Sequence, residues 1–241
     1  MSVLINGRLY LGAYDLSGYA NQLEPKPSVA MKKTTTLLTQ GVDQDECGYE
    51  TFSLGGKLFM LADGTSIATY KSHDIIRAYW KLTDIPLTWC PNGGAVGDLA
   101  GSFQATVAEC QPNGTVGEFY AATLKADASR GIWVYGAILA TGAIVAGGNG
   151  AAQLLGAVAA TQAVYGALHV LAAAGGTLTV KIQSDDNAGF TSPTDRLSFT
   201  AATGKTYQWL ALAGPITDTY WRAVWTLPAG SATFVTMAGI R

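Results

Sequence analysis

The chain has 241 residues, enough for one large or two modest domains with a buried core. Hydrophobic residues make up 49% of it and charged residues only 13%, which excludes an intrinsically disordered chain. The net charge of −2 provides no basic surface of the kind that nucleic-acid-binding proteins use. With so few charges, electrostatic repulsion does little to keep copies of the chain apart. We therefore expect much of its surface to be covered in an assembly.

The N-terminal part of the sequence predicts a long β-hairpin arm at about residues 28–60. Two β-prone stretches flank an acidic tip at residues 43–46, and the second stretch alternates apolar and polar residues after Tyr49. An isolated two-stranded ribbon is marginal in water, so we expect the arm to pack against another subunit. The side chains that we expect at this subunit interface are Lys32, Lys33, Asp43, Asp45, Glu46, Tyr49 and Phe52.

Residues 66–80 predict a helix. At 3.6 residues per turn, Ile76, Tyr79 and Trp80 share an apolar face, while charged residues gather on the opposite face. Short β-prone segments separated by glycine and proline turns follow the helix. We therefore expect a first domain over residues 1–140 that consists mainly of antiparallel strands with this helix on its flank.

Fifty consecutive residues between Arg130 and Lys181 contain no Asp, Glu, Lys or Arg. Such a gap indicates either membrane insertion or extensive packing. The residues are mostly small, glycines interrupt them at 147–150, and no Lys/Arg cluster flanks them to orient a membrane span. We therefore expect packed β structure and no membrane partner, with a linker at residues 141–150.

Residues 151–241 predict a second, all-β domain. Strands recur at the spacing of a sandwich, and residues 179–183 (TVKIQ) alternate between two faces. The expected fold class of the whole chain is therefore mainly β. It comprises a β-sandwich or barrel with one flanking helix and a long hairpin arm, followed by a C-terminal sandwich of the jelly-roll type.

No residue pattern typical of an enzyme or a cofactor site occurs. His73 and His169 lack a nucleophile elbow, and no glycine motif for nucleotide binding is present. Cys47, Cys90 and Cys110 form an odd set without metal-ligand spacing, so free thiols are the expectation. We expect no enzymatic activity, no catalytic residue, no cofactor and no metal.

Two features of the C-terminal half leave alternatives open. The loop at residues 184–187 (SDDN) carries oxygen ligands that suit calcium, but a hydrophilic turn uses the same residues. Trp209 and Trp221 could form an aromatic platform that binds sugars, but aromatic residues on sandwich strands lie more often in a core or an interface.

Five short stretches share features with one family of viral proteins. They are residues 9–21 (LYLGAYDLSGYAN), 114–118 (GTVGE), 167–170 (ALHV), 180–186 (VKIQSDD) and 214–222 (GPITDTYWR). Together they resemble the major tail tube proteins of long-tailed, siphovirus-type bacteriophages. The stretches lie in both halves of the chain, whereas the minimal members of that family have a single domain.

The resemblance implies a structural virion protein. Its copies would form rings, as hexamers or as trimers of two-domain subunits, and the rings would stack into the tail tube. DNA would pass through the lumen without specific binding, and other tail proteins would be partners. The chain would be made in the host cytoplasm, because its first residues lack the apolar core of a signal peptide. A carbohydrate- or surface-binding module and a head decoration protein are the alternative functions.

Overall fold

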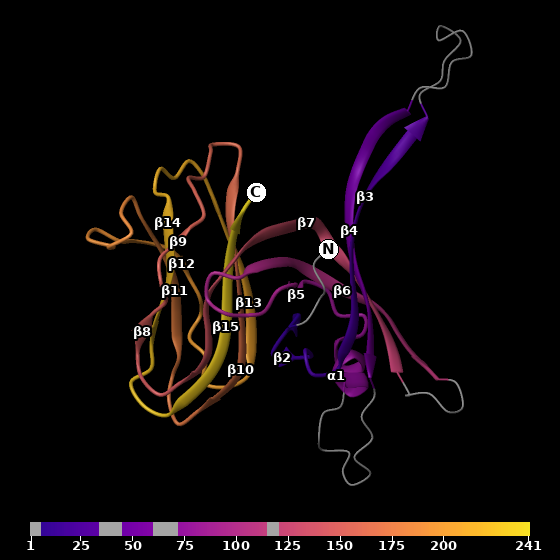
Figure 1. Cartoon of the computed structure of the whole chain (residues 1–241), viewed down its shortest axis with the longest axis horizontal. Helices are drawn as coiled ribbons and strands as arrows, with labels where there is room; N and C mark the ends of the chain where they lie inside the picture. Colours follow the sequence, from indigo (N-terminus) through magenta and orange to yellow (C-terminus); the bar gives the residue numbers. More distant parts are fainter. Residues whose placement is uncertain (1–5, 34–44, 60–71, 115–120) are drawn as a thin grey trace, which may run out of the picture. The chain divides into compact units, whose positions relative to one another are not determined.

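The fold is mainly β. The structure, a computed structural model, describes residues 6–33, 45–59, 72–114 and 121–241 (Figure 1). Within these residues the strands pair antiparallel in two sheets that do not close into a barrel, and one α-helix is present. The predicted fold class, with a long hairpin and a single helix, is confirmed at this level.

The chain forms two compact units, and each unit is assembled from separate stretches of sequence. The hairpin unit, named for its long hairpin, comprises Tyr19–Asp84 and Ala105–Trp133. The sandwich unit comprises Met1–Gly18, Ile85–Gln104 and Val134–Arg241.

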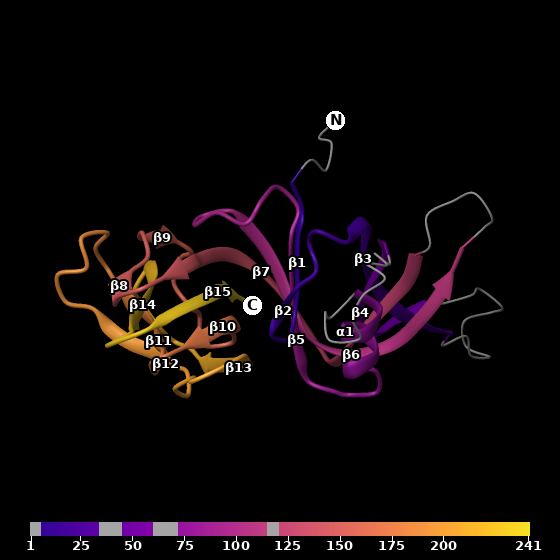
Figure 2. The same cartoon turned by 90° about the horizontal axis from the view of Figure 1, so that it is seen from below.

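The hairpin unit contains β3 (Ala20–Lys33), β4 (Asp45–Phe59), α1 (Ser72–Tyr79) and parts of β6 (Leu99–Asn113) and β7 (Ala121–Ile144). Its strands pair in the order β3–β4–β7–β6 (Figure 2). The β3–β4 pairing reaches out to Lys33 opposite Asp45, and β4 pairs with β7 from Ser53 opposite Asp127 to Phe59 opposite Ala121. The predicted arm is therefore a continuous hairpin over the described residues.

Strict alternation along β4 gives this sheet one buried face. Phe52, Leu54 and Leu58 are buried, whereas Thr51 and Lys57, each next to a buried residue in the sequence, are exposed. Successive side chains of a strand point to opposite faces, so every second residue of β4 joins the core of the unit. The other face remains polar.

Helix α1 has the predicted apolar face, but it ends before Trp80, the last residue predicted for that face. Ile76 and Tyr79 are buried and Arg77 is exposed, as expected. Residues 60–71, which include the predicted start, lie outside the described residues. The helix ends at Tyr79, so the predicted apolar-face residue Trp80 is instead 48% exposed.

The sandwich unit contains the remaining strands. They are β1 (Arg8–Leu11), β2 (Tyr14–Asp15), β5 (Ile85–Cys90), β8 (Gly148–Asn149), β9 (Gln153–Leu154), β10 (Ala163–Ala174), β11 (Thr179–Asp185), β12 (Thr194–Ser198), β13 (Thr206–Ala213), β14 (Tyr220–Thr226) and β15 (Ser231–Ile240), with parts of β6 and β7. One layer has the order β13–β10–β15–β7, and the other has the order β12–β11–β14–β8, with β9 also paired to β14 (Figure 1).

The main core of the sandwich unit lies between these two layers. Leu168 and Phe234 from the first layer pack with Ile182 and Trp221 from the second, and all four are essentially inaccessible to solvent. A second cluster, which includes Tyr10, covers residues of β5, β10 and β15. Burial of apolar side chains of this size is the main source of stability for the unit.

The observed units differ from the predicted consecutive domains 1–140 and 151–241. Strands β6 and β7 are long enough to run through both units, and β7 continues to Ile144. Within the predicted linker at 141–150, β7 pairs with β15 and β8 pairs with β14. The small, uncharged residues of this stretch suit strand pairing. Most of the predicted linker is therefore part of the sandwich.

Candidate interaction surfaces

The distal part of the β3–β4 hairpin exposes large apolar side chains. Val29 is 42% exposed, Met31 56% and Tyr49 81%. Met31 lies opposite Cys47 in the register of the hairpin, and Cys47 is exposed as well. A two-stranded ribbon whose described side chains are exposed gains little stability from its own contacts, so this segment provides a surface that another chain can cover.

The predicted interface residues of the arm differ in their exposure to solvent. Lys32 and Tyr49 are exposed, as an interface requires. Phe52 is only 2% exposed and stacks on Trp133, with ring centroids 4.9 Å apart, so it belongs to the core of the hairpin unit and is not an interface residue. The prediction for Phe52 is wrong because the alternation of β4 turns it inward. Lys33, Asp45 and Glu46 lie on strands without a described side-chain environment, and Asp43 lies outside the described residues.

Strand β3 forms an edge of the hairpin unit's sheet. Among the described strands it pairs only with β4. Pro25 and Pro27 lie on this edge strand, and proline has no backbone N–H to donate to an added strand. This stretch of the edge therefore resists strand addition, which favours side-chain contacts over sheet extension for any partner that binds here.

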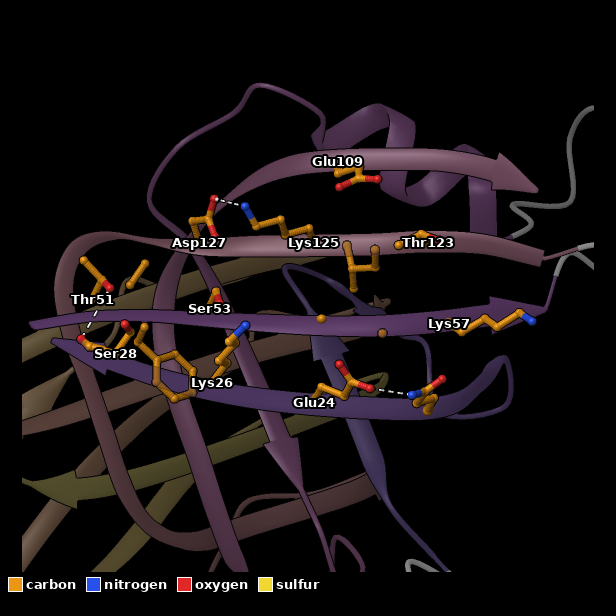
Figure 3. A pocket seen from close by; sticks show the side chains of 16 residues that line it. Glu24, Lys26, Ser28, Thr51, Ser53, Lys57, Glu109, Thr123, Lys125 and Asp127 are labelled. Atoms are coloured by element: carbon orange, nitrogen blue, oxygen red, sulfur yellow. Dashed lines mark hydrogen bonds and ion pairs between the residues drawn. The ribbon is translucent and has the colours of Figure 1, made fainter. Parts of the chain in front are cut away.

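A groove of about 770 Å³ with charged side chains in its lining, the charged groove, lies on the exposed face of the same sheet (Figure 3). Alternate residues of β3 and several residues of β4 and β7 line it, together with Glu109 of β6. Its charges balance, because three carboxylates and three lysines line it: Glu24, Glu109, Asp127, Lys26, Lys57 and Lys125. Lys125 and Asp127 form an ion pair of 3.5 Å. A surface without net charge neither concentrates nor strongly repels a polyanion.

A second exposed apolar pair follows α1. Trp80 is 48% and Leu82 47% exposed, and Lys81 between them has φ of +68°. The N–H of Lys81 donates to the carbonyl of Val107 on β6 at 3.3 Å, and the N–H of Leu82 donates to the carbonyl of Tyr79 at 3.0 Å. The left-handed conformation is unfavourable for a residue with a side chain, so the surrounding bonds hold the loop in a shape that presents both side chains.

Asp84 anchors the end of this loop. Its own φ is +61°, and its two carboxylate oxygens accept bonds from Arg130 Nε at 3.1 Å and Nη2 at 2.7 Å. Ser129 Oγ adds a third bond at 2.7 Å. The hydrogen bonds from Arg130 and then Ser129 lower the pKa of Asp84 below its ordinary value. A bidentate pair fixes geometry well even where solvent screening keeps its energy small.

His169 lies at the centre of a buried hydrogen-bond chain in the sandwich unit. Its Nδ1 is 2.7 Å from the carbonyl oxygen of Gly12, which can only accept, so Nδ1 carries the hydrogen. Its Nε2 is 2.8 Å from Thr88 Oγ1, and Thr88 in turn contacts Ser102 Oγ at 2.8 Å. Burial lowers the pKa of His169 to about 4. A neutral, fully buried imidazole with both nitrogens occupied is a structural group that joins β10 to β5.

The described cysteines are all free, as the sequence predicts. Cys47 is exposed and Cys110 half-buried, whereas Cys90 is fully buried. Burial raises the pKa of the Cys90 thiol to about 12, so it stays protonated and unreactive at neutral pH.

The proposed aromatic platform is not formed by Trp221. Trp221 is fully buried between the layers of the sandwich, and its indole N–H donates to the carbonyl of Gly156 at 2.9 Å. Its position on an inward-facing site of β14 makes it a core residue, so this part of the prediction is wrong. Trp209 is half-buried on β13 beside Tyr165, with ring centroids 5.9 Å apart. A platform at Trp209 stays a prediction.

The loop at 184–187 uses its oxygens to hold its own backbone. Asp185 accepts from the N–H of Asn187 at 3.1 Å and from that of Ser192 at 2.9 Å. Ser184 Oγ donates to Asp218 at 2.6 Å, and this bond, with that from Arg196, lowers the pKa of Asp218. Across the residues that the structure describes, no group of three or more His, Cys, Asp or Glu side chains is arranged to hold a metal ion. The hydrophilic-turn alternative accounts for these contacts.

The antiparallel fold defines a β-rich protein with an exposed apolar hairpin, and comparisons with known proteins add no family. No protein-family model and no curated protein matches the chain. Within its described residues, none of the helical structure has the length and apolar character of a membrane span.

Two solved structures show distant similarity. The Dit protein (gp 19.1) of SPP1, described as a paradigm of the hub adsorption apparatus in phages that infect Gram-positive bacteria, aligns over 98% of this chain and 99% of its own. The identity is 14% and the TM-score 0.39. A family 16 carbohydrate-binding module aligns over 47% of this chain and 79% of its own, with 16% identity and a TM-score of 0.26. TM-scores this low assign neither protein's role to this chain.

Proposed function

We propose that the chain is a structural subunit of the tail of a long-tailed bacteriophage. Its copies assemble into rings, hexameric in the simplest case, and the rings stack into the tail tube through which DNA passes. The sequence resemblance to tail tube proteins motivates the proposal. The chain acts with other tail proteins in the virion and has no catalytic role and no cofactor.

The exposed distal hairpin is the observation that carries the proposal. Val29, Met31 and Tyr49 place apolar surface at the end of a ribbon that has no cover within the described residues of its own chain. Exposed apolar surface of this kind marks protein–protein contacts. The low charge of the whole chain also favours self-association, because little electrostatic repulsion opposes the approach of further copies.

The balanced charge of the charged groove is compatible with a DNA conduit. Phosphate contacts dominate the affinity of proteins for DNA, so a wall rich in unpaired lysines would retain it. The three lysines of the groove are matched in number by three carboxylates, and Lys125 forms an ion pair with Asp127. DNA passing such a surface would find no continuous row of cations.

Electron microscopy of the purified full chain tests the proposal, with sedimentation velocity over a concentration series as the second measurement. We expect closed rings, and short tubes as the concentration rises. Rings that never stack would remove the tube assignment but leave a ring-forming tail component. A single monomeric species up to high concentration, in the presence and absence of crowding agents, would overturn the proposal.

A further inference from the structure

The exposed large apolar side chains of the hairpin unit form two separate patches. Val29, Met31 and Tyr49 make up the arm patch, and Trp80 and Leu82 make up the loop patch. Within the described residues of the unit, these five are all the large apolar side chains that are exposed. Isolated exposed apolar residues are common on protein surfaces, but two sets concentrated on two segments require an explanation.

The two patches lie at opposite edges of one sheet. The arm patch belongs to the outer part of the β3–β4 hairpin, and β3 is one edge of the order β3–β4–β7–β6. The loop patch lies beyond the other edge, because Trp80 bridges to Val107 of β6 and Lys81 donates to the same residue. Four inter-strand steps of about 4.8 Å separate β3 from the loop, roughly 19 Å in all. One copy's arm patch therefore does not cover its own loop patch.

We propose that the arm patch of one copy packs on the loop patch of the next copy. This inference rests on the proposed function, for which it names the contacting side chains. The contact joins two different surfaces, so it is heterologous, and each copy keeps one free patch of each kind until the series closes. Such a contact builds a ring where the rotation between successive copies closes, whereas a contact between two identical patches stops at a dimer.

The loop patch has the features of an interaction hot spot. Tryptophan is enriched at the centres of protein interfaces, and Lys81 Nζ lies over the Trp80 ring, 4.8 Å from its centroid, so a cation–π contact helps to fix the position of the ring. Two non-glycine residues with positive φ, Lys81 and Asp84, shape the loop, and Arg130 clamps it. A loop already held in one shape loses little entropy when a partner covers it.

A cysteine pair tests the contact directly, because Cys47 already lies opposite Met31 in the arm patch. The parent variant is Cys110→Ser, which leaves Cys47 as the accessible thiol beside the buried Cys90. Leu82→Cys is added to this parent, and a matched control adds Leu154→Cys, at a position of the sandwich unit that is 68% exposed. A short bismaleimide is then applied to assembled protein.

We expect covalent dimers and a ladder of higher species from the Leu82→Cys variant, and monomers from the parent and the Leu154→Cys control. Peptide mapping should identify the link between positions 47 and 82. Efficient cross-linking of the parent itself would show that arms meet arms, which overturns the head-to-tail contact. Rings that carry no 47–82 link would overturn it as well.

A second variant separates this inference from the proposed function. Trp80→Ser combined with Leu82→Ser should lower the self-association constant at least tenfold while the circular dichroism spectrum stays that of the parent. Val145→Ser, at a 77% exposed site of the sandwich unit, is the matched control and should assemble normally. If the double variant forms rings as well as the parent, the loop patch is not the docking site although the ring function stands. If the unaltered chain forms no rings, the proposed function itself fails.

Discussion

At the scale of single residues, the sandwich unit depends on polar groups that are buried and satisfied. His169 is the central example, because its two ring nitrogens join the Gly12 carbonyl to the Thr88 hydroxyl in the absence of solvent. A buried polar chain of this kind specifies one arrangement of strands, since any other arrangement leaves a donor or acceptor unpaired.

The burial of His169 predicts a pH-dependent stability. Its pKa is about 4 in the folded state and about 6.5 when the chain unfolds, so between these values the unfolded state binds more protons. The contribution of His169 to the free energy of unfolding is therefore greatest above pH 6.5. It falls as the pH drops toward 4, by up to about 3 kcal/mol. Urea unfolding at several pH values measures this loss.

The control for this titration is His169→Gln, which cannot take up a proton. The variant should be less stable at pH 7, because the buried chain is altered, but its stability should change less between pH 7 and pH 4.5. Equal slopes for the two proteins would show that other groups cause the pH dependence.

A tight contact at Gly101 gives a second residue-scale prediction. A Cβ atom there would lie 2.1 Å from Cζ2 of Trp89, which is 3% exposed and packs edge-on to Phe103. The ring has little room to move, so Gly101→Ala should destabilise the protein by about 1–3 kcal/mol, as overpacked cores do. Thermal unfolding measures the loss.

The matched control is Gly204→Ala, since a Cβ atom at Gly204 meets nothing within 4 Å. This substitution should leave the unfolding temperature unchanged or raise it slightly, because alanine restricts the unfolded chain. A Gly101→Ala variant as stable as the Gly204→Ala variant would mean that the Trp89 ring yields easily.

At the scale of elements, two of the aromatic side chains of strand β4 have opposite roles. Phe52 is buried against Trp133, and Tyr49, three residues earlier, is 81% exposed. Phe52→Ala should lower the stability of the subunit by about 3–5 kcal/mol through the cavity it leaves. Tyr49→Ala should change that stability by no more than about 0.5 kcal/mol, as exposed substitutions do.

Assembly should show the reverse pattern. We expect Tyr49→Ala to weaken ring formation, measured by sedimentation, although the isolated subunit is as stable as before. Comparable losses of subunit stability in the two variants would contradict the assignment of Tyr49 to a surface and Phe52 to a core.

The same strand illustrates what the sequence can predict. Hydrophobic alternation and turn residues were sufficient for the hairpin, for the apolar face of α1 and for the β-rich C-terminal half. Alternation also puts Phe52 on the same face as Leu54, so the pattern itself could have assigned Phe52 to the core.

Other features depend on contacts between residues far apart in sequence. A tryptophan such as Trp221 suits both a binding platform and a core. The pairing of β14 with β11 places it in the core, and this pairing cannot be seen in the local sequence. The exposure of Trp80 follows from the early end of α1, which one helical wheel does not reveal. Residues 141–150 read as a linker because strand partners supplied by β14 and β15 cannot be seen locally.

At the scale of the whole molecule, low charge and apolar patches predict how assembly responds to salt. A contact between the arm patch and the loop patch buries apolar surface, so it should persist or strengthen in about 1 M sodium sulfate. A contact made through the charged groove would instead weaken as ions screen it, since the Debye length is only about 3 Å at 1 M ionic strength. Sedimentation in low salt and in high sulfate distinguishes the two cases, and rings that fall apart at high salt would point to the groove.

The order of strands in the sandwich has a consequence for biosynthesis. Strand β15 comes latest in the sequence among the described strands, yet it lies between β10 and β7 and pairs with both. Until the ribosome has released this segment, β7 and β10 lack their shared neighbour and the layer cannot close. A chain interrupted before residue 231 would keep the pairings of β10 with β13 and of β7 with β6, but one edge of β7 and one edge of β10 would stay unpaired. Unpaired strand edges invite association with other strands, so an incomplete chain would be prone to aggregate in a way that the full chain is not.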